Sequence, residues 1–411
     1  MRMYRIALSL LLLVPCATRI AANAEEATKA MPDEHERLCR QALVSIGDAA
    51  RVQHALAKAR RGEPIVVGTI GGSITQGASA SAEENRWPNR VAQWWRATFP
   101  QSVVTLVNAG IGATGSDVGA HRVQAHLLDK HPDFIVAEYA VNDSINPMAG
   151  ETLEGLVRQI LRQPNHPALM LLFTMDDHGR NVQDAHKAVG AHYRLPMVSC
   201  RDGLWPEIEA GRMKWDDIAA DMVHPNDRGH AFCADFVTCV LATVLRDLPD
   251  DKALPPVEPC PESLISDVFE HTKLYNRDSL QPVKNDGWRP AENPYFGGGW
   301  ETDAPGSVLA FDVEGDVIGL LFYRIKGPMG IALAQVDDRP PVRAEAWFDA
   351  DWGGYTPYQL VARDLGPGKH RLRITLSQDK QDGSDGNTFQ VVGILIAGTK
   401  RLAYKGGVGD V

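Results

Sequence analysis

The residue types best suited to nucleophilic catalysis occur in two short stretches of the sequence. Ser73 lies within Gly71–Gly77 (GGSITQG), where two glycines permit a tight turn that exposes the hydroxyl group. Asp221 and His224 are three residues apart, so the carboxylate can orient the imidazole as a general base. Together, a serine, a histidine and an aspartate can activate a hydroxyl for attack on a carbonyl carbon.

Two further stretches contain groups that could hold the negative charge created by such an attack. The glycine-rich segment 108–115 can bring a backbone N–H close to a substrate oxygen, and the Asn142 carboxamide can donate a hydrogen bond without adding charge. Each motif also has an ordinary structural interpretation, as a turn, a phosphate-binding loop or a helix cap. Residues 71–77 lack the Gly-Lys-Ser/Thr of a P-loop and the G-x-S-x-G spacing of a nucleophile elbow.

Alternating strands and helices are expected to position these motifs. Short continuous apolar runs predict strands buried on both faces, and the 3.6-residue periodicity between them predicts helices. This alternation is typical of a parallel sheet covered on both sides, in which ligands bind at the carboxyl ends of the strands. The predicted strands are 65–70, 103–107, 134–139, 168–173 and 197–199, and the predicted helices are 33–60, 90–99, 118–128, 153–161, 183–192 and 227–248.

The order of the four motifs resembles that of the SGNH hydrolases, also called GDSL esterases, over residues 60–247. The resemblance implies a three-layer, flavodoxin-like α/β domain and an acyl-serine mechanism that needs no metal and no cofactor. It implies that Ser73 is the nucleophile, that His224 is the base and that Asp221 orients His224.

The same resemblance implies which groups hold the oxyanion. These are the N–H groups of Ser73 and Ala113 and the side-chain amide of Asn142. Gly112, the neighbour of Ala113, is a further candidate for contact with the substrate. The family usually has glycine where this chain has Ala113, but a backbone donor does not require glycine.

The first motif also bears on the substrate, because Gly72 stands where the family usually has aspartate. The Gly-Gly-Ser-Ile-Thr form resembles a branch associated with carbohydrate esterases. It implies an exported serine esterase that hydrolyses O-acetyl or other small acyl esters on a polysaccharide or oligosaccharide. The alternatives are a lipase or general carboxylesterase, a polysaccharide O-acetyltransferase with the same triad, and a carbohydrate-binding protein with a relic catalytic domain.

The N-terminal segment predicts export. Residues 1–24 combine basic Arg2 and Arg5, an apolar run and a small-residue cleavage site after Ala24, which is typical of a secretory signal peptide. We therefore expect a secreted or periplasmic protein without stable membrane insertion, since no later segment reads as a membrane span. The net charge of −10 argues against a nucleic-acid partner, and the oligomeric state stays open.

The cysteines are compatible with export but do not reveal their pairing. The sequence has six, and one of them, Cys16, lies in the predicted signal peptide. The others show no zinc-ligand spacing, so we expect buried thiols and one or two disulfides. These cysteines are Cys39, Cys200, Cys233, Cys239 and Cys260.

The pattern changes after residue 248. We expect a leader and helix over 25–62, the hydrolase domain over 63–248 and a proline-rich linker over 249–264. Residues 265–411 alternate with period two and predict an antiparallel β-sandwich that could bind carbohydrate. Trp288 and Trp300, close to Tyr295 and Phe296, are candidate sugar-stacking residues, with burial in the core or at the domain interface as the alternative. The predicted strands are 308–313, 317–323, 331–336, 344–348, 358–362, 370–376 and 389–396.

Overall fold

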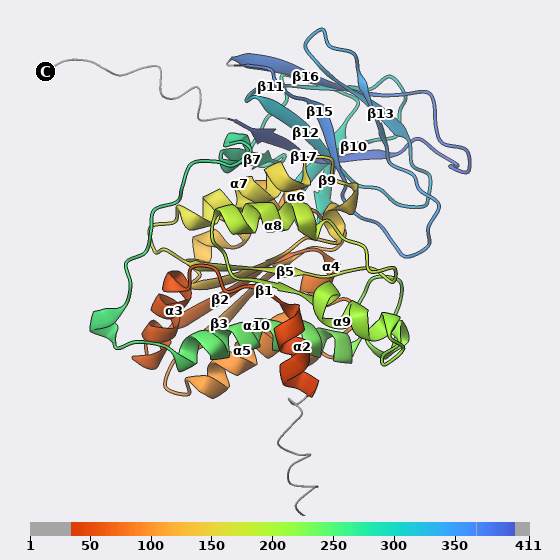
Figure 1. Cartoon of the computed structure of the whole chain (residues 1–411). Helices are drawn as coiled ribbons and strands as arrows, with labels where there is room; N and C mark the ends of the chain where they lie inside the picture. Colours follow the sequence, from red (N-terminus) through yellow and green to blue (C-terminus); the bar gives the residue numbers. More distant parts are fainter. Residues whose placement is uncertain (1–33, 367, 399–411) are drawn as a thin grey trace, which may run out of the picture.

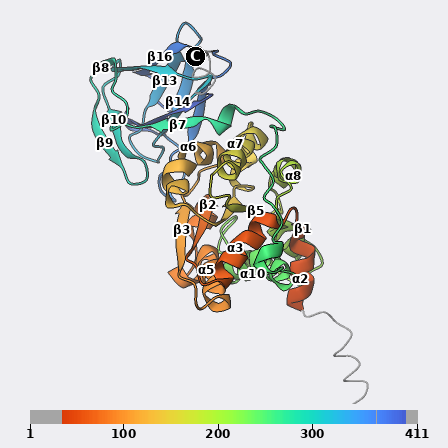
Figure 2. The ribbon, with the colours of Figure 1, turned by 90° about the vertical axis from the view of Figure 1, so that its left-hand side faces the viewer.

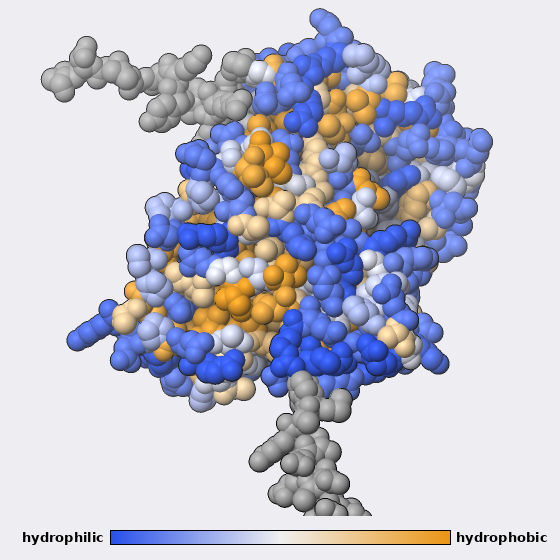
Figure 3. Space-filling model, in the orientation of Figure 1, coloured by the Kyte–Doolittle hydropathy of each residue, from blue (hydrophilic) through white to orange (hydrophobic). Residues whose placement is uncertain are grey.

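The computed structural model describes residues 34–366 and 368–398, which form an α/β domain and a β domain in contact with each other (Figures 1 and 2). The predicted signal peptide, residues 1–24, and Cys16 lie outside the described residues. On the face seen in Figure 3, hydrophilic side chains cover most of both domains, and a hydrophobic patch lies over the middle of the α/β domain.

A six-stranded sheet forms the centre of the α/β domain, with the strand order β1-β6-β5-β4-β2-β3. All pairs are parallel except the edge pair β1–β6. This is the expected doubly wound, flavodoxin-like arrangement, so the predicted fold class is confirmed. The strands are β1 (Leu43–Ser45), β2 (Ile65–Gly71), β3 (Val104–Gly110), β4 (Phe134–Glu138), β5 (Ala168–Phe173) and β6 (Met197–Ser199).

Helices cover both faces of this sheet. One core cluster joins the sheet to α2, α3, α5, α9 and α10, and a second joins the opposite face to α6, α7 and α8 (Figure 1). The helices are α2 (Glu34–Ala42), α3 (Ala50–Arg60), α4 (Ser73–Gln76), α5 (Trp87–Thr98), α6 (Ser116–His126), α7 (Ala149–Leu161), α8 (Gln183–His192), α9 (Cys200–Glu209) and α10 (Asp227–Arg246).

The prediction of one helix over 33–60 is wrong. The segment folds as α2, the short strand β1 and α3 because Leu43 pairs with Val198 of β6 and fills the edge of the sheet. Gly47 then turns the chain with a φ of 59°, in a place where a side chain would collide with the backbone of Arg194. Asp48 accepts a hydrogen bond from the Ala50 amide and starts α3.

Helix α9 was not predicted from the sequence. It contains Gly203 and Pro206, which normally interrupt helices, but Ser199 caps its first turn by accepting a hydrogen bond from the Asp202 amide.

Helix α10 corrects another expectation, because by length and composition alone it could cross a membrane. Its buried side chains, such as Phe236 and Val240, belong to the core of the α/β domain.

The β domain consists of two antiparallel sheets that face each other across an apolar core. One has the order β15-β12-β17-β10-β9, with β7 also paired to β17, and the other has the order β14-β13-β16-β11-β8. Strands β7 to β10 were missed because they are short and rich in glycine, proline and charge. The strands are β7 (Thr272–Tyr275), β8 (Lys284–Asp286), β9 (Arg289–Asn293), β10 (Gly297–Thr302), β11 (Val308–Glu314), β12 (Val317–Phe322), β13 (Ile331–Val336), β14 (Val342–Glu345), β15 (Tyr358–Ala362), β16 (Lys369–Leu376) and β17 (Phe389–Ala397).

The two domains share a packed interface. Helix α6 lies against β7 and β17, and Val118 of α6 belongs to an apolar cluster with Phe296 and Leu395 of the β domain. A second contact at the interface is an ion pair, in which the buried guanidinium group of Arg158 on α7 pairs with Glu270 at 2.8 Å. An apolar cluster and a buried ion pair together hold the β domain in a defined position against α6 and α7.

Candidate active site

Three side chains from separate parts of the α/β domain form a hydrogen-bonded line. Ser73 is the first residue of α4, directly after β2, and its Oγ lies 2.8 Å from Nε2 of His224. Nδ1 of His224 lies 2.7 Å from Oδ2 of Asp221. If Nδ1 carries the imidazole proton and donates it to Asp221, Nε2 is free to accept from the serine hydroxyl. The structure therefore brings together the three residues predicted to act on an acyl group.

The loop that carries Asp221 and His224 is held by its own hydrogen bonds. Oδ1 of Asp221 accepts from the amides of Val223 and His224 at 2.8 and 2.7 Å, and Trp215 donates to the Asp221 carbonyl. Burial alone would raise the pKa of Asp221, but the hydrogen bonds from the His224 ring and these amides outweigh it and lower the pKa. The carboxylate is thus kept ionised beside the imidazole.

Asn142 lies directly over the turn that carries Ser73. A side chain at Gly72 would collide with the Asn142 carboxamide, so the family's aspartate could not occupy this position without movement of Asn142. The Oδ1 atom of Asn142 is buried and has no hydrogen-bond partner among the described residues. Within the same residues the Asn142 amide donates to no protein acceptor, which leaves it free for a ligand oxygen.

Ala113 and Gly112 differ in what their amides do. The Gly112 N–H donates to Oε1 of Gln76 at 3.0 Å, so it is already engaged within the protein. Ala113 adopts a φ of 53°, and in the part of the chain described its amide donates to no protein acceptor. Of the two neighbours, Ala113 is therefore the one whose amide can serve an oxyanion.

The β domain reaches this site through Tyr295, on the loop between β9 and β10. Nε2 of Gln76, in the helix that begins with Ser73, donates to the Tyr295 hydroxyl at 3.0 Å. Tyr295 is 47% exposed, so its ring lies open to solvent beside the site. This contact links residues 219 positions apart in the sequence, and no local pattern indicated it.

Trp288 and Trp300 do not line the site, which corrects their assignment as substrate-binding residues. Their exposed fractions are 5% and 3%, and both belong to the core between the two sheets of the β domain. Trp300 packs edge-on against Phe311. Buried rings of this kind cannot stack on a sugar, so the alternative interpretation of burial in the core is the correct one.

A buried carboxyl group supports the nucleophile turn and was missed in the sequence. Glu138, the last residue of β4, accepts hydrogen bonds from the hydroxyls of Thr75 at 2.9 Å and Thr174 at 2.6 Å. Burial raises the pKa of Glu138, although the two hydroxyls oppose the shift. An acidic residue at the end of the otherwise apolar strand Phe134–Glu138 is the sequence signal that could have indicated this role of Glu138.

Arg122 of α6 holds the ends of the central strands together. Its buried guanidinium group donates to the carbonyls of Ala109 at 2.6 Å and Gly71 at 3.0 Å, and to the Tyr139 hydroxyl at 3.1 Å. These residues lie in β3, in β2 and just after β4. Arg122 therefore fixes the places from which Ser73 and the loop of Ala113 leave the sheet.

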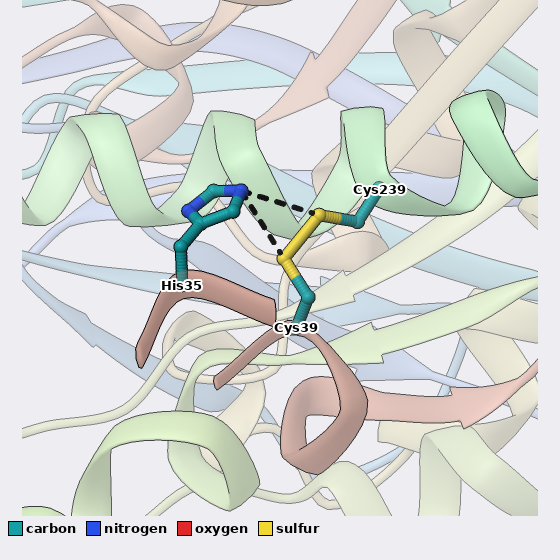
Figure 4. Close-up of side chains that lie close together, drawn as sticks. All are labelled: His35, Cys39 and Cys239. Carbon is teal, nitrogen blue, oxygen red and sulfur yellow. Dashed lines mark hydrogen bonds between the residues drawn. A yellow bond between two sulfur atoms is a disulfide. The ribbon is translucent and has the colours of Figure 1, made fainter. Parts of the chain in front are cut away.

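Two clusters among the described residues have residue types that could bind a metal, and one of them joins α2 to α10. His35 of α2 lies with its Nε2 3.7 Å from the sulfur atoms of Cys39 and of Cys239 on α10 (Figure 4). The two sulfurs are joined in a disulfide. Because a disulfide offers no thiolate, the residues as they stand do not form a thiolate metal site.

The fold and the hydrogen-bonded Ser–His–Asp line define a serine hydrolase that acts on carboxylic esters. Residues 69–232 match the model of the GDSL-like lipase/acylhydrolase family. A two-domain esterase (CEX) active on acetylated mannans is 30% identical, with a TM-score of 0.82 over 88% of this chain and 99% of that one. The chain belongs to the GDSL-like lipase/acylhydrolase family, so the predicted resemblance to SGNH hydrolases is confirmed.

Two other similar proteins extend the comparison. The structure of a CEX esterase co-crystallised with mannopentaose is 31% identical and has a TM-score of 0.80 over 88% of this chain and 98% of that one. The thioesterase 1/protease 1/lysophospholipase L1 of Escherichia coli is 26% identical over 176 residues, which cover 41% of this chain and 79% of that protein. The similarity to CEX thus spans both domains, whereas that to the thioesterase is confined to a part of the chain.

Proposed function

We propose that this protein is an exported serine esterase that removes acetyl groups from a polysaccharide or oligosaccharide through an acyl-serine intermediate. The observation that carries the proposal is the unbroken line from Ser73 through His224 to Asp221. The substrate class is supported by the similarity over both domains to an esterase active on acetylated mannans. The exposed ring of Tyr295 beside the nucleophile turn adds an aromatic surface suited to a sugar.

The proposed reaction begins with proton transfer from the Ser73 hydroxyl to Nε2 of His224. The serine oxygen attacks the ester carbonyl, and the new oxyanion accepts hydrogen bonds from the amides of Ser73 and Ala113 and from the Asn142 side chain. His224 then gives this proton to the departing sugar oxygen as the bond from that oxygen to the carbonyl carbon breaks, which releases the sugar hydroxyl and leaves acetyl-Ser73. Water attacks the acetyl-serine in the second half of the reaction, with His224 again as the base.

Export is part of the proposal, with cleavage after Ala24 and a secreted or periplasmic location. The Cys39–Cys239 disulfide supports it, because disulfides persist in oxidising compartments and are rare in the cytosol. The N-terminal residue of the protein recovered from the periplasm or medium tests this part. Recovery of only full-length chain in the cytosol would contradict it.

The activity is tested by measuring acetate released from a panel of acetylated mannans, xylans and pectins. We expect release from at least one of them, and a loss of at least a thousandfold in Ser73→Ala. Ser144→Ala is a matched control, because Ser144 is exposed two residues after Asn142 and outside the hydrogen-bonded line. Equal activity of wild type and Ser73→Ala would overturn the mechanism.

Synthetic esters and an acetyl donor separate the alternatives. A preference for p-nitrophenyl octanoate over the acetate, with no release from any glycan, would identify a lipase or general carboxylesterase. Acetylation of a glycan from an added donor, without net hydrolysis, would identify an O-acetyltransferase. Binding of glycan without turnover of any ester would leave a carbohydrate-binding protein.

A further inference from the structure

Two buried thiols face each other behind the loop that carries Asp221 and His224. The sulfur atoms of Cys200 and Cys233 lie 3.3 Å apart, and the two residues are 4% and 3% exposed. Cys200 is the first residue of α9, and Cys233 lies in the second turn of α10. Among the described cysteines that are not disulfide-bonded, the third, Cys260, is only half-buried and lies on the proline-rich segment that precedes the β domain.

We propose that Cys200 and Cys233 form a second disulfide, which closes the stretch of chain that carries Asp221 and His224. The proposal rests on the proposed export, which supplies an oxidising compartment, and not on the proposed substrate. Two S–H bonds break and one S–S bond forms, and the two thiols lose two protons and two electrons. The oxidant is a small-molecule or protein disulfide, such as oxidised glutathione, which is reduced to two thiols.

The geometry requires only a small movement. A disulfide has an S–S length of about 2.05 Å, so a change of roughly 1 Å from the present sulfur separation closes the bond. The two residues belong to different helices that pack into one core cluster, which already holds their sulfurs at van der Waals distance. No comparable partner is present for Cys260 among the described residues.

The burial of the pair determines when the bond can form. The hydrogen bond with Cys200, together with burial, raises the pKa of the Cys233 thiol well above its usual value. Disulfide exchange needs access for the oxidant, and the folded protein buries both sulfur atoms. The bond must therefore form while the chain folds, before α9 and α10 close over the two sulfurs.

The position of the pair relates it to the candidate active site. A small apolar cavity of about 30 Å³ is lined by both cysteines together with Ile74, Val223 and Pro225. Ile74 follows Ser73, and Val223 and Pro225 flank His224. A displacement of α9 from α10 would therefore reach the residues on either side of the hydrogen-bonded line.

The second bond would complete a covalent connection among three helices. The Cys39–Cys239 disulfide already joins α2 to α10 (Figure 4). A bond between Cys200 and Cys233 would join α9 to the same helix, six residues before Cys239. α9 also meets α2 through the buried carboxylate of Glu207, which pairs with Arg37 at 2.6 Å.

Peptide mapping tests the bond directly. The full chain is unfolded, reduced, refolded in a buffer of oxidised and reduced glutathione, alkylated and digested without reductant. We expect a peptide pair linked through Cys200 and Cys233, two hydrogens lighter than its reduced components, with Cys260 alkylated. The Cys39–Cys239 pair serves as the positive control. If that pair is linked while Cys200 and Cys233 are both alkylated after unfolding, the proposal is wrong.

Stability measurements provide a second test that does not depend on ester hydrolysis. The half-life of the fold at a fixed elevated temperature is followed by circular dichroism for Cys200→Ala, Cys233→Ala, the double variant and the matched control Cys260→Ala. A disulfide predicts at least a tenfold loss in each single variant and little further loss in the double variant. Two thiols that only pack against each other would instead give a small loss in each variant.

Discussion

At the scale of single residues, the backbone of Ala113 is held in a strained conformation. A φ of 53° places it in the left-handed region, which costs a residue with a side chain roughly 1–2 kcal/mol. Its amide is the proposed backbone donor from this loop. The site therefore uses a conformation that glycine would adopt more easily, while the function assigned to the residue belongs to its N–H alone.

We expect Ala113→Gly to stabilise the protein by about 0.5–1 kcal/mol, because relief of the strain exceeds the entropy that glycine loses on folding. The kcat should stay within about twofold of wild type, since the N–H remains. Denaturant unfolding and ester kinetics check the two parts. Ala109→Gly, in strand β3, is the control and should destabilise. A large fall in kcat for Ala113→Gly would show that the methyl group matters.

Asn142 gives the converse expectation, because here the side chain is the donor. Asn142→Ala should lower kcat on p-nitrophenyl acetate by about 10²–10³, the typical cost of losing one oxyanion donor, and leave KM nearly unchanged. The matched control is again Ser144→Ala. A rise in KM of the same size, with kcat unchanged, would assign Asn142 to substrate binding instead.

At the scale of the elements, Arg122 connects the ends of the central strands to the candidate active site. Its guanidinium group donates hydrogen bonds to carbonyls at the ends of β2 and β3 and to the Tyr139 hydroxyl just after β4. Burial lowers the pKa of this guanidinium group, and no carboxylate lies among its hydrogen-bond partners. The donors and the nucleophile all leave the sheet at these points, so small shifts there are transmitted to the reacting groups.

We expect Arg122→Met to reduce kcat at least tenfold, since misplacement of catalytic groups by a fraction of an ångström is costly. Steady-state kinetics on p-nitrophenyl acetate measure it. Arg96→Met is the matched control, because Arg96 donates to the Val104 carbonyl at the opposite end of β3. If the kcat of Arg122→Met stays as close to wild type as that of Arg96→Met, Arg122 does not fix the geometry of the site.

At the scale of the whole molecule, a carboxyl group near the domain interface links pH to stability. Asp117 lies in the first turn of α6, close to Asp143, while Tyr358 of the β domain stacks on His121 of the same helix. Burial, followed by repulsion from Asp143, raises the pKa of Asp117 to about 7. The folded state therefore favours the protonated form of this group.

The pKa of Asp117 is higher in the folded state than its unfolded value of about 3.9. Protonation of Asp117 therefore stabilises the fold, and this contribution to stability is complete below about pH 4. It is lost as the pH rises through 7. Asp117→Asn should therefore unfold at a higher temperature than wild type at pH 8 and show a clearly smaller gain at pH 5. Thermal unfolding at both values checks it, with the exposed Asp129→Asn as control. An identical gain at both values would exclude titration as its cause.

The sequence allowed prediction of the sheet, most of its helices and the residues of the hydrogen-bonded line. These depend on short-range information, because Ser73 and Asn142 follow apolar strands and the Asp221–His224 pair is local. The sequence did not determine whether Trp288 and Trp300 lie in the core or on the surface, since an aromatic residue near a strand can pack in a core or stack on a sugar. The break at Gly47 was hidden by continuous helical periodicity.

Contacts between distant segments were also beyond prediction. Arg122 donates to backbone carbonyls, which every residue has, so no residue type in the sequence indicates these contacts. Glu138 accepts hydrogen bonds from residues on α4 and just after β5, which are distant from it in the sequence. The approach of Tyr295 to Gln76 requires knowledge of how the β domain sits on α6. The residue types of the site could therefore be anticipated, but not the side chains that hold it in shape.

The hydrogen bond between Tyr295 and Gln76 has an evolutionary consequence. Gln76 engages the Gly112 amide on one side and a tyrosine of the other domain on the other. A shuffling event that replaced the β domain with an unrelated module would remove one partner of a side chain that lies three residues after Ser73. The two halves of the gene should therefore be inherited together, and lineages that lost the second half should show a different residue in place of Gln76.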